Sequence, residues 1–241
     1  MTDGRSAGAS ARRVERPRPG GLAAVLFDMD GLLVDSEPVW TVAETELAER
    51  LGRRWTPELK QLVLGTGLDE AVRRILAYFG ATDEDPAAVG RWLLTRVEEL
   101  FRGALPMRPG ALRLLDALAE ADVPLALVSS SYRVLVDAAL DEVGAWRFAV
   151  TVAGDEVANT KPHPEPYLTA AARLGARPER CVVFEDSWSG VRSGEAAGCL
   201  VVAVPDHVAV EATPTRPVLA SLEDVDLDWL LDLPASLRAA T

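Results

Sequence analysis

Short apolar runs alternate with segments of helical periodicity along most of the chain. Each of five runs is bounded by turn or polar residues, which is typical of strands buried on both faces of a parallel sheet. These runs occupy residues 23–27, 124–128, 148–153, 181–184 and 200–204. Amphipathic helices are predicted at residues 111–121, 132–143, 164–174 and 189–197. The alternation predicts an α/β fold, in which right-handed crossovers cover both faces of a parallel sheet with helices.

One long segment departs from this alternation. From residue 39 to about residue 105 the apolar residues keep helical spacing, as in Val72, Ile75, Leu76 and Phe79, and no convincing strand interrupts them. This change of period predicts a helical module inserted into the α/β domain after its first strand.

The change of period also sets the predicted boundaries. We assign the α/β core to residues 21–37 and 106–241, the helical module to residues 38–105 and a flexible tail to residues 1–20. The tail is rich in arginine but lacks the apolar stretch of a secretory signal. The core ends in an acidic segment with one helix predicted around residues 227–231.

The charge of the chain narrows the partners that it can take. A formal net charge of −12 disfavours nucleic acid or an acidic membrane, because phosphate binding needs a cationic face. No apolar run approaches the roughly 18–20 residues of a membrane span, which predicts a soluble protein. The two cysteines, Cys181 and Cys199, form no C-x-x-C pair, so we expect reduced thiols and a cytoplasmic location. No self-complementary apolar stripe is evident, and we expect a monomer.

Polar side chains follow three of the predicted strands. Because the carboxyl ends of parallel strands meet at one edge of a sheet, we expect these side chains to gather there despite their separation in sequence. They are Asp28 and Asp30, Ser129 and Ser130, and Glu185 and Asp186. In a strand of period two the first pair would point the same way, so their charges need a cation, a proton or a catalytic task. The alternative is a solvated strand-to-loop turn.

Two further features favour an anionic ligand at this edge. Ser129 and Ser130 precede a predicted helix, whose N-terminal N–H groups together with the hydroxyls suit a phosphate, although simple helix capping is the alternative. Lys161 is one of only two lysines and lies in a loop before another predicted helix. A compact ammonium suits a point contact with a phosphate oxygen or a carboxylate, whereas the alternative is a solvated loop lysine.

The acidic residues predict a specific chemistry. The candidate ligands Asp28, Asp186 and Glu185 offer oxygen without Cys or His, which favours Mg²⁺ over zinc. A carboxylate can attack phosphorus when Mg²⁺ and Lys161 offset the repulsion between the two anions. Asp30, two residues beyond Asp28, is suited to protonate the leaving alcohol and then to activate water.

These residues resemble four ordered motifs of the haloacid dehalogenase-like hydrolase superfamily. The matching segments are Phe27-Asp28-Met29-Asp30-Gly31 with Asp35-Ser36-Glu37, then Ser129-Ser130, Lys161-Pro162, and Glu185-Asp186-Ser187 with Gly190. The resemblance spans residues 22–204. It implies a five-stranded Rossmann-like core with a mobile helical cap, Asp28 as nucleophile and Asp30 as acid/base. It also implies that Asp28, the Asp30 carbonyl and Asp186 hold Mg²⁺, with Glu185 in support.

Within the superfamily, the inserted helices resemble the helical-cap group that includes β-phosphoglucomutase and phosphoglycolate phosphatase. The first motif and Lys161-Pro-His-Pro are most similar to hexitol and 2-deoxyglucose-6-phosphate phosphatases. The resemblance therefore implies a phosphatase of sugar or polyol phosphates, with substrate contacts from Gly67 and Leu68. A phosphosugar mutase is the alternative, disfavoured by Trp40 and Leu68 where mutases carry histidine and arginine. A non-catalytic regulatory member of the fold is a further alternative, which the complete motif set disfavours.

Overall fold

The computed structural model describes residues 21–103, 105–206 and 209–239, with side chains described as far as residue 233. The predicted tail of residues 1–20 lies outside this part of the chain. Within it, no helix is both long enough and apolar enough to cross a membrane.

A five-stranded parallel sheet forms the centre of the molecule, in the order β3-β2-β1-β4-β5. The strands are β1 (Ala24–Phe27), β2 (Leu125–Val128), β3 (Val150–Val152), β4 (Cys181–Glu185) and β5 (Leu200–Ala203). All five lie within or next to the predicted apolar runs, so the α/β prediction is confirmed. Strand β1 is central, which places the turn after it between the ends of β2 and β4.

Helices cover both faces of the sheet. Alternate side chains of β1 pack against the helices on opposite faces. Val25 and Phe27 belong to one apolar cluster with helices α5, α6 and α9, whereas Ala24 and Leu26 belong to a second with α7 and α8. The helices are α5 (Ala111–Glu120), α6 (Arg133–Val143), α7 (Glu165–Arg173), α8 (Trp188–Ala196) and α9 (Leu227–Ala239). Short 3₁₀ turns are η2 (Ala145–Arg147), η3 (Gly154–Glu156), η4 (Pro178–Arg180) and η5 (Leu222–Asp224). Helix α9 is longer than the five residues expected.

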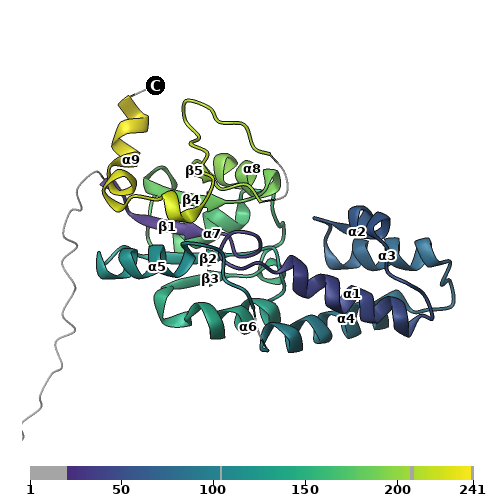
Figure 1. Cartoon of the computed structure of the whole chain (residues 1–241). Coiled ribbons are helices and arrows are strands. Elements are labelled where there is room, and N and C mark those ends of the chain that lie inside the picture. The colour runs from purple at the N-terminus through teal and green to yellow at the C-terminus, as the bar shows by residue number, and fades with distance from the viewer. Residues whose placement is uncertain (1–20, 104, 207–208, 240–241) are drawn as a thin grey trace, which may run out of the picture.

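Four helices, called here the helical insert, follow β1 before the chain returns to the sheet. Figure 1 shows them grouped to one side of the core, on the right in that view. They are α1 (Glu37–Arg50), α2 (Pro57–Val63), α3 (Leu68–Phe79) and α4 (Pro86–Phe101). Local signals begin and end them: Thr56 caps α2, Asp85 caps α4, and Gly80 ends α3 in the left-handed conformation. The boundaries of the insert at residues 38 and 105 remain a prediction. In the structure, helix α1 begins one residue before the first of them, at Glu37.

The two connections between core and insert run side by side. Asp35 N donates to Pro106 O at 2.8 Å, and Arg108 N donates to Leu33 O at 2.9 Å, around an antiparallel bridge from Val34 to Met107. This pairing anchors the insert next to the carboxyl end of β1, where the candidate chemistry lies.

Candidate active site

Asp28 and Asp30 follow directly after β1, outside the strand itself. Strand β1 ends at Phe27, and Gly31 adopts a positive φ of 77° that closes the turn. Backbone pairing with β4 continues at Asp28, whose N–H donates to Phe184 O at 3.1 Å. Asp28 contacts Lys161, whereas Asp30 contacts serine hydroxyls, so the two carboxylates have different surroundings from the outset.

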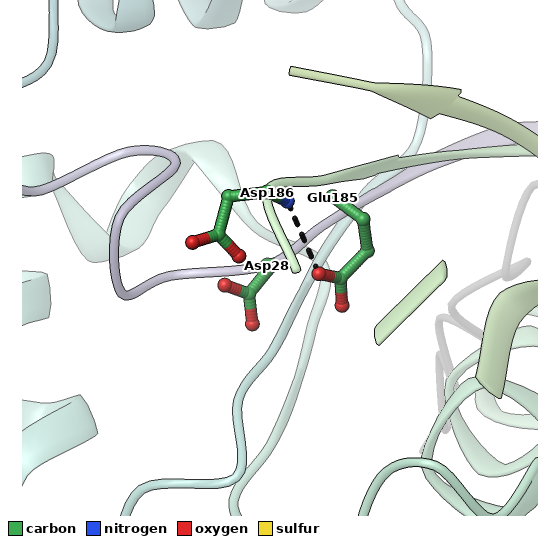
Figure 2. A group of neighbouring side chains, drawn as sticks. All are labelled: Asp28, Glu185 and Asp186. Atoms are coloured by element: carbon green, nitrogen blue, oxygen red, sulfur yellow. Dashed lines mark hydrogen bonds between the residues drawn. The ribbon is translucent and has the colours of Figure 1, made fainter. Parts of the chain in front are cut away.

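Three carboxylates from the ends of β1 and β4 form an acidic cluster. Asp28, Glu185 and Asp186 each offer an oxygen, and these oxygens all lie within 4.8 Å of one another (Figure 2). Burial, together with Glu185 and Asp30, raises the pKa of Asp28 to about 8 despite the opposing effect of Lys161. Burial and Asp28 likewise raise the pKa of Asp186 well above its ordinary value. The cluster thus carries more negative charge than its surroundings offset, which suits a hard divalent cation such as Mg²⁺.

The oxygens of Glu185 are already engaged by protein donors. Oε1 accepts from Lys161 Nζ at 2.7 Å and from Tyr167 at 2.5 Å, and Oε2 accepts from Asp186 N and Ser187 Oγ. Direct metal ligation is therefore better suited to Asp28 and Asp186, with Glu185 in a supporting place.

The shape of helix α8 makes room for Glu185. Ser187 caps α8 by accepting a hydrogen bond from Gly190 N at 3.1 Å. A Cβ built on Gly190 would overlap the Glu185 carboxyl group. Glycine at this position lets the first turn of α8 lie directly against the carboxylate.

Lys161 is buried in the site rather than solvated. Its side chain is 4% exposed, and its ammonium donates to Asp28, Glu185 and, at 2.9 Å, Val128 O. These acceptors use all three N–H donors of the ammonium. Burial lowers the pKa of Lys161, but the Asp28 and Glu185 carboxylates outweigh it and raise the pKa above its usual value. The ammonium is therefore a fixed positive charge beside Asp28.

The serines after β2 surround Asp30. Ser129 Oγ donates to Asp30 Oδ2 at 3.1 Å and Ser131 Oγ donates to the same oxygen at 2.8 Å, while Ser129 Oγ also accepts from Ser131 N. Asp30 Oδ1 is buried and has no hydrogen-bond partner among the described residues. Ser130 is exposed, so it lies outside this network.

Two residues of this site were missed from the sequence. Ser131 continues the run of Ser129 and Ser130, and this continuity is the signal that could have indicated it. Tyr167 gave no such signal, since its place in an amphipathic helix predicts only core packing. In the structure its hydroxyl contacts Glu185 and its ring lies near Lys161.

The residues expected to contact substrate from the insert lie at the start of α3. Gly67 is the N-cap of α3, and Leu68 is the first residue of that helix. Leu68 lines a cavity of about 230 Å³ between α3, α4 and the core residue Tyr132. The other lining residues are Asp69, Ala87, Gly90, Arg91 and Leu94. Tyr132, the core residue of this lining, immediately follows Ser131 in the chain.

The sequence of this chain is similar to those of known hydrolases. A family model described as haloacid dehalogenase-like hydrolase matches residues 22–198. Hexitol phosphatase A of Escherichia coli is 36% identical over 74% of this chain and 81% of its own length. A phosphorylated carbohydrates phosphatase of Thermotoga maritima is 33% identical over 73% of this chain and 82% of its own.

A solved structure supports the same relationship. The structure of CbbY from Rhodobacter sphaeroides in complex with phosphate superposes with a TM-score of 0.72 at 28% identity, covering 84% of this chain and 96% of that one. The sheet order, the acidic cluster at the carboxyl end of β1 and the family match lead to one conclusion: the chain belongs to the haloacid dehalogenase-like hydrolase family.

Proposed function

We propose that this protein is a Mg²⁺-dependent phosphatase of small phosphorylated metabolites, with sugar or polyol phosphates as substrates and an aspartyl-phosphate as intermediate. The observation that carries the proposal is the contrast between two neighbouring carboxylates. Asp28 is buried against the Lys161 ammonium beside Asp186. Asp30, by contrast, accepts from two hydroxyls through one oxygen, and its other oxygen has no partner in the part of the chain that the structure describes. The names of the relatives, which include phosphatases of hexitols and of phosphorylated carbohydrates, support the same substrate class.

The reaction proceeds in two displacements at phosphorus. A carboxylate oxygen of Asp28 attacks, the bond from phosphorus to the leaving oxygen breaks, and Asp30 gives that oxygen its proton. Asp30, now ionised, removes a proton from water, whose oxygen attacks the phosphorus and releases Asp28 and inorganic phosphate. Lys161 offsets the repulsion between Asp28 and the incoming phosphate throughout.

Mg²⁺ would be held by the carboxylates of Asp28 and Asp186 and by the Asp30 carbonyl, with Glu185 in support. When bound, it would supply positive charge that offsets the charge of the phosphoryl group. The raised pKa values of Asp28 and Asp186 support this assignment, since a cation in the cluster would favour their ionised forms.

Phosphate binding is assigned to Lys161, Ser129 and Ser130, close to the N-terminus of α6. In the present structure the Ser129 hydroxyl donates to Asp30, and the three donors of Lys161 are engaged. Contact with a phosphate oxygen therefore requires each of these two side chains to exchange one protein partner for the substrate.

The helical insert is assigned the part of a cap that selects substrate through Gly67 and Leu68. The cavity next to Leu68 is lined by apolar residues together with Asp69, Arg91 and Tyr132, whose polar groups suit a substrate body bearing hydroxyl groups. We further propose that the protein acts in the cytoplasm as a monomer, without nucleic acid or a membrane as partner.

The decisive experiment is a panel of phosphorylated sugars, polyols, glycolate and nucleotides, assayed for phosphate release with and without Mg²⁺. We expect Mg²⁺-dependent release from at least one sugar or polyol phosphate. Asp28→Asn should lower the rate at least about 1,000-fold, because the nucleophile is lost. Absence of release from every compound, or full turnover by Asp28→Asn, would contradict the proposal.

The mutase alternative is tested by the fate of β-glucose 1-phosphate. A mutase would convert it to the 6-phosphate without loss to free phosphate, whereas we expect no such conversion. A non-catalytic regulatory protein would give neither product in any arm of the panel.

A further inference from the structure

Tyr167 lies against both members of the Lys161–Glu185 ion pair. Its hydroxyl donates to Glu185 Oε1 at 2.5 Å, and its ring centroid is 5.0 Å from Lys161 Nζ. The side chain is fully buried on the face of α7 that packs against the sheet. Tyr167 takes no direct part in the two proposed displacements at phosphorus.

We propose that Tyr167 is a positioning residue that holds the Lys161 ammonium beside Asp28, acting through its hydrogen bond to Glu185 and through the face of its ring. This inference rests on the proposed function. It adds a residue outside the four motifs to the set on which phosphoryl transfer depends.

Hydrogen bonds to both of its oxygens fix the Glu185 carboxylate. Oε1 is shared by Tyr167 and Lys161, and Oε2 accepts from Asp186 N and Ser187 Oγ. Tyr167 is therefore one of four donors that fix this carboxylate. Removing its hydroxyl leaves Oε1 bound to Lys161 alone, free to follow the ammonium rather than to hold it.

The Lys161 side chain is flexible, so its ammonium needs contacts that hold it in place. Four rotatable bonds separate the Lys161 backbone from its ammonium, so the position of the charge depends on its acceptors and on the surface against which it packs. Glu185 and Val128 O supply two acceptors besides the nucleophile, and the electron-rich face of Tyr167 lies near the charge. Burial and Glu185 raise the pKa of Tyr167, so the phenol stays a hydrogen-bond donor.

The test compares Tyr167→Phe with Tyr78→Phe. Phenylalanine keeps the ring at position 167 and removes only the hydroxyl, whereas Tyr78 is 47% exposed on α3 and its hydroxyl pairs with Thr56, at 3.3 Å. We expect Tyr167→Phe to lower kcat about tenfold or more with KM within about threefold, because the hydrogen bond it loses has a charged partner. Tyr78→Phe should match the unmodified protein in both constants.

A double-mutant cycle separates positioning from general packing. If Tyr167 acts through Glu185, then Tyr167→Phe in a Glu185→Gln background should lower kcat less than about twofold further. Equal fold-losses in the two backgrounds would overturn the proposal. Thermal unfolding of all variants shows whether a loss of activity follows only from loss of folded protein.

A spectroscopic readout makes the proposal testable without turnover. The chain has only two lysines, so labelling lysine with ¹³C and ¹⁵N yields two side-chain ammonium signals, with Lys60 as internal reference. Tyr167→Phe should shift the Lys161 signal and speed exchange of its ammonium protons while leaving Lys60 unchanged. An unchanged Lys161 signal would overturn the positioning role. Absence of phosphatase activity in the unmodified protein would instead contradict the proposed function.

Discussion

The ammonium of Lys161 donates a hydrogen bond to the carboxylate of Asp28, although 133 positions separate the two residues in the chain. The pair is almost fully buried, with side chains 4% and 9% exposed, and Glu185 shares the same ammonium. A single positive charge therefore lies among several acidic groups. Burial, together with the neighbouring carboxylates, raises the pKa values of Asp28 and Asp186.

The stability of the metal-free protein should fall as pH rises. The pKa of Asp28 is raised from 3.8 to about 8 in the folded state, so between these values the folded protein holds a proton that the unfolded chain has released. Stability from this proton is fully present below the lower value and is lost as pH rises through the higher one. Thermal unfolding in a chelator from about pH 5 to about pH 9 measures the slope. Asp28→Asn should flatten it, and an unchanged slope would contradict the assignment.

Mg²⁺ should stabilise the protein against unfolding through the acidic cluster. At a free Mg²⁺ concentration of 100 times its dissociation constant, the expected gain in free energy of unfolding is about 3 kcal/mol. Asp186→Asn should remove most of this gain, because the cluster loses one of the two carboxylates assigned to the metal. Asp83→Asn, an exposed change in the helical insert, serves as control and should keep the gain. Equal gains in both variants would argue against the site.

Replacing Gly190 should disturb the support of the site. A Cβ at this position overlaps the Glu185 carboxyl group, so Gly190→Ala is expected to lower the free energy of unfolding by about 1–3 kcal/mol. Gly90→Ala in α4 is the matched control for stability, since the nearest atom to its added Cβ is 3.9 Å away. Urea unfolding of both variants checks the difference. Equal stability would show that the carboxylate moves aside without cost.

Asp30 should matter most for substrates with poor leaving groups. Asp30→Asn removes the proton donor, so hydrolysis of an alkyl phosphate should slow by about 10²–10⁴-fold, while an aryl phosphate with a weakly basic leaving group should lose less. Metal binding should be largely retained. A variant that hydrolyses alkyl phosphates at the normal rate would refute the role.

Ser131→Ala should produce a smaller loss with the same dependence on the leaving group, because Ser131 holds Asp30 Oδ2 at 2.8 Å. Ser221→Ala, which removes the cap of η5, is the control and should leave both substrates unaffected. A loss that is equal for alkyl and aryl phosphates would indicate that Ser131 does not act through Asp30.

The sequence by itself predicted a parallel sheet covered by helices, with polar side chains at one edge, but not the order of the strands. Strands buried on both faces must be continuously apolar, so β1, β2 and β4 were visible as runs, and the polar residues that end them had to meet at one edge. The change to helical period marked the insert for the same reason. Burial requires a regular pattern of apolar residues, continuous in these strands and helically spaced in the helices, and the elements with such a pattern were predicted closely.

Only the tertiary structure decided which partner each polar group takes. Periodicity indicates which face of a helix is buried but not which carboxylate lies opposite, so the contact between the Tyr167 hydroxyl and Glu185 was not predicted. The hydroxyls of Ser129 and Ser131 were likewise free to face a phosphate, and in the fold they face Asp30. Hydrogen bonds between distant segments depend on atomic distances of a few tenths of an ångström, which the order of residues does not encode.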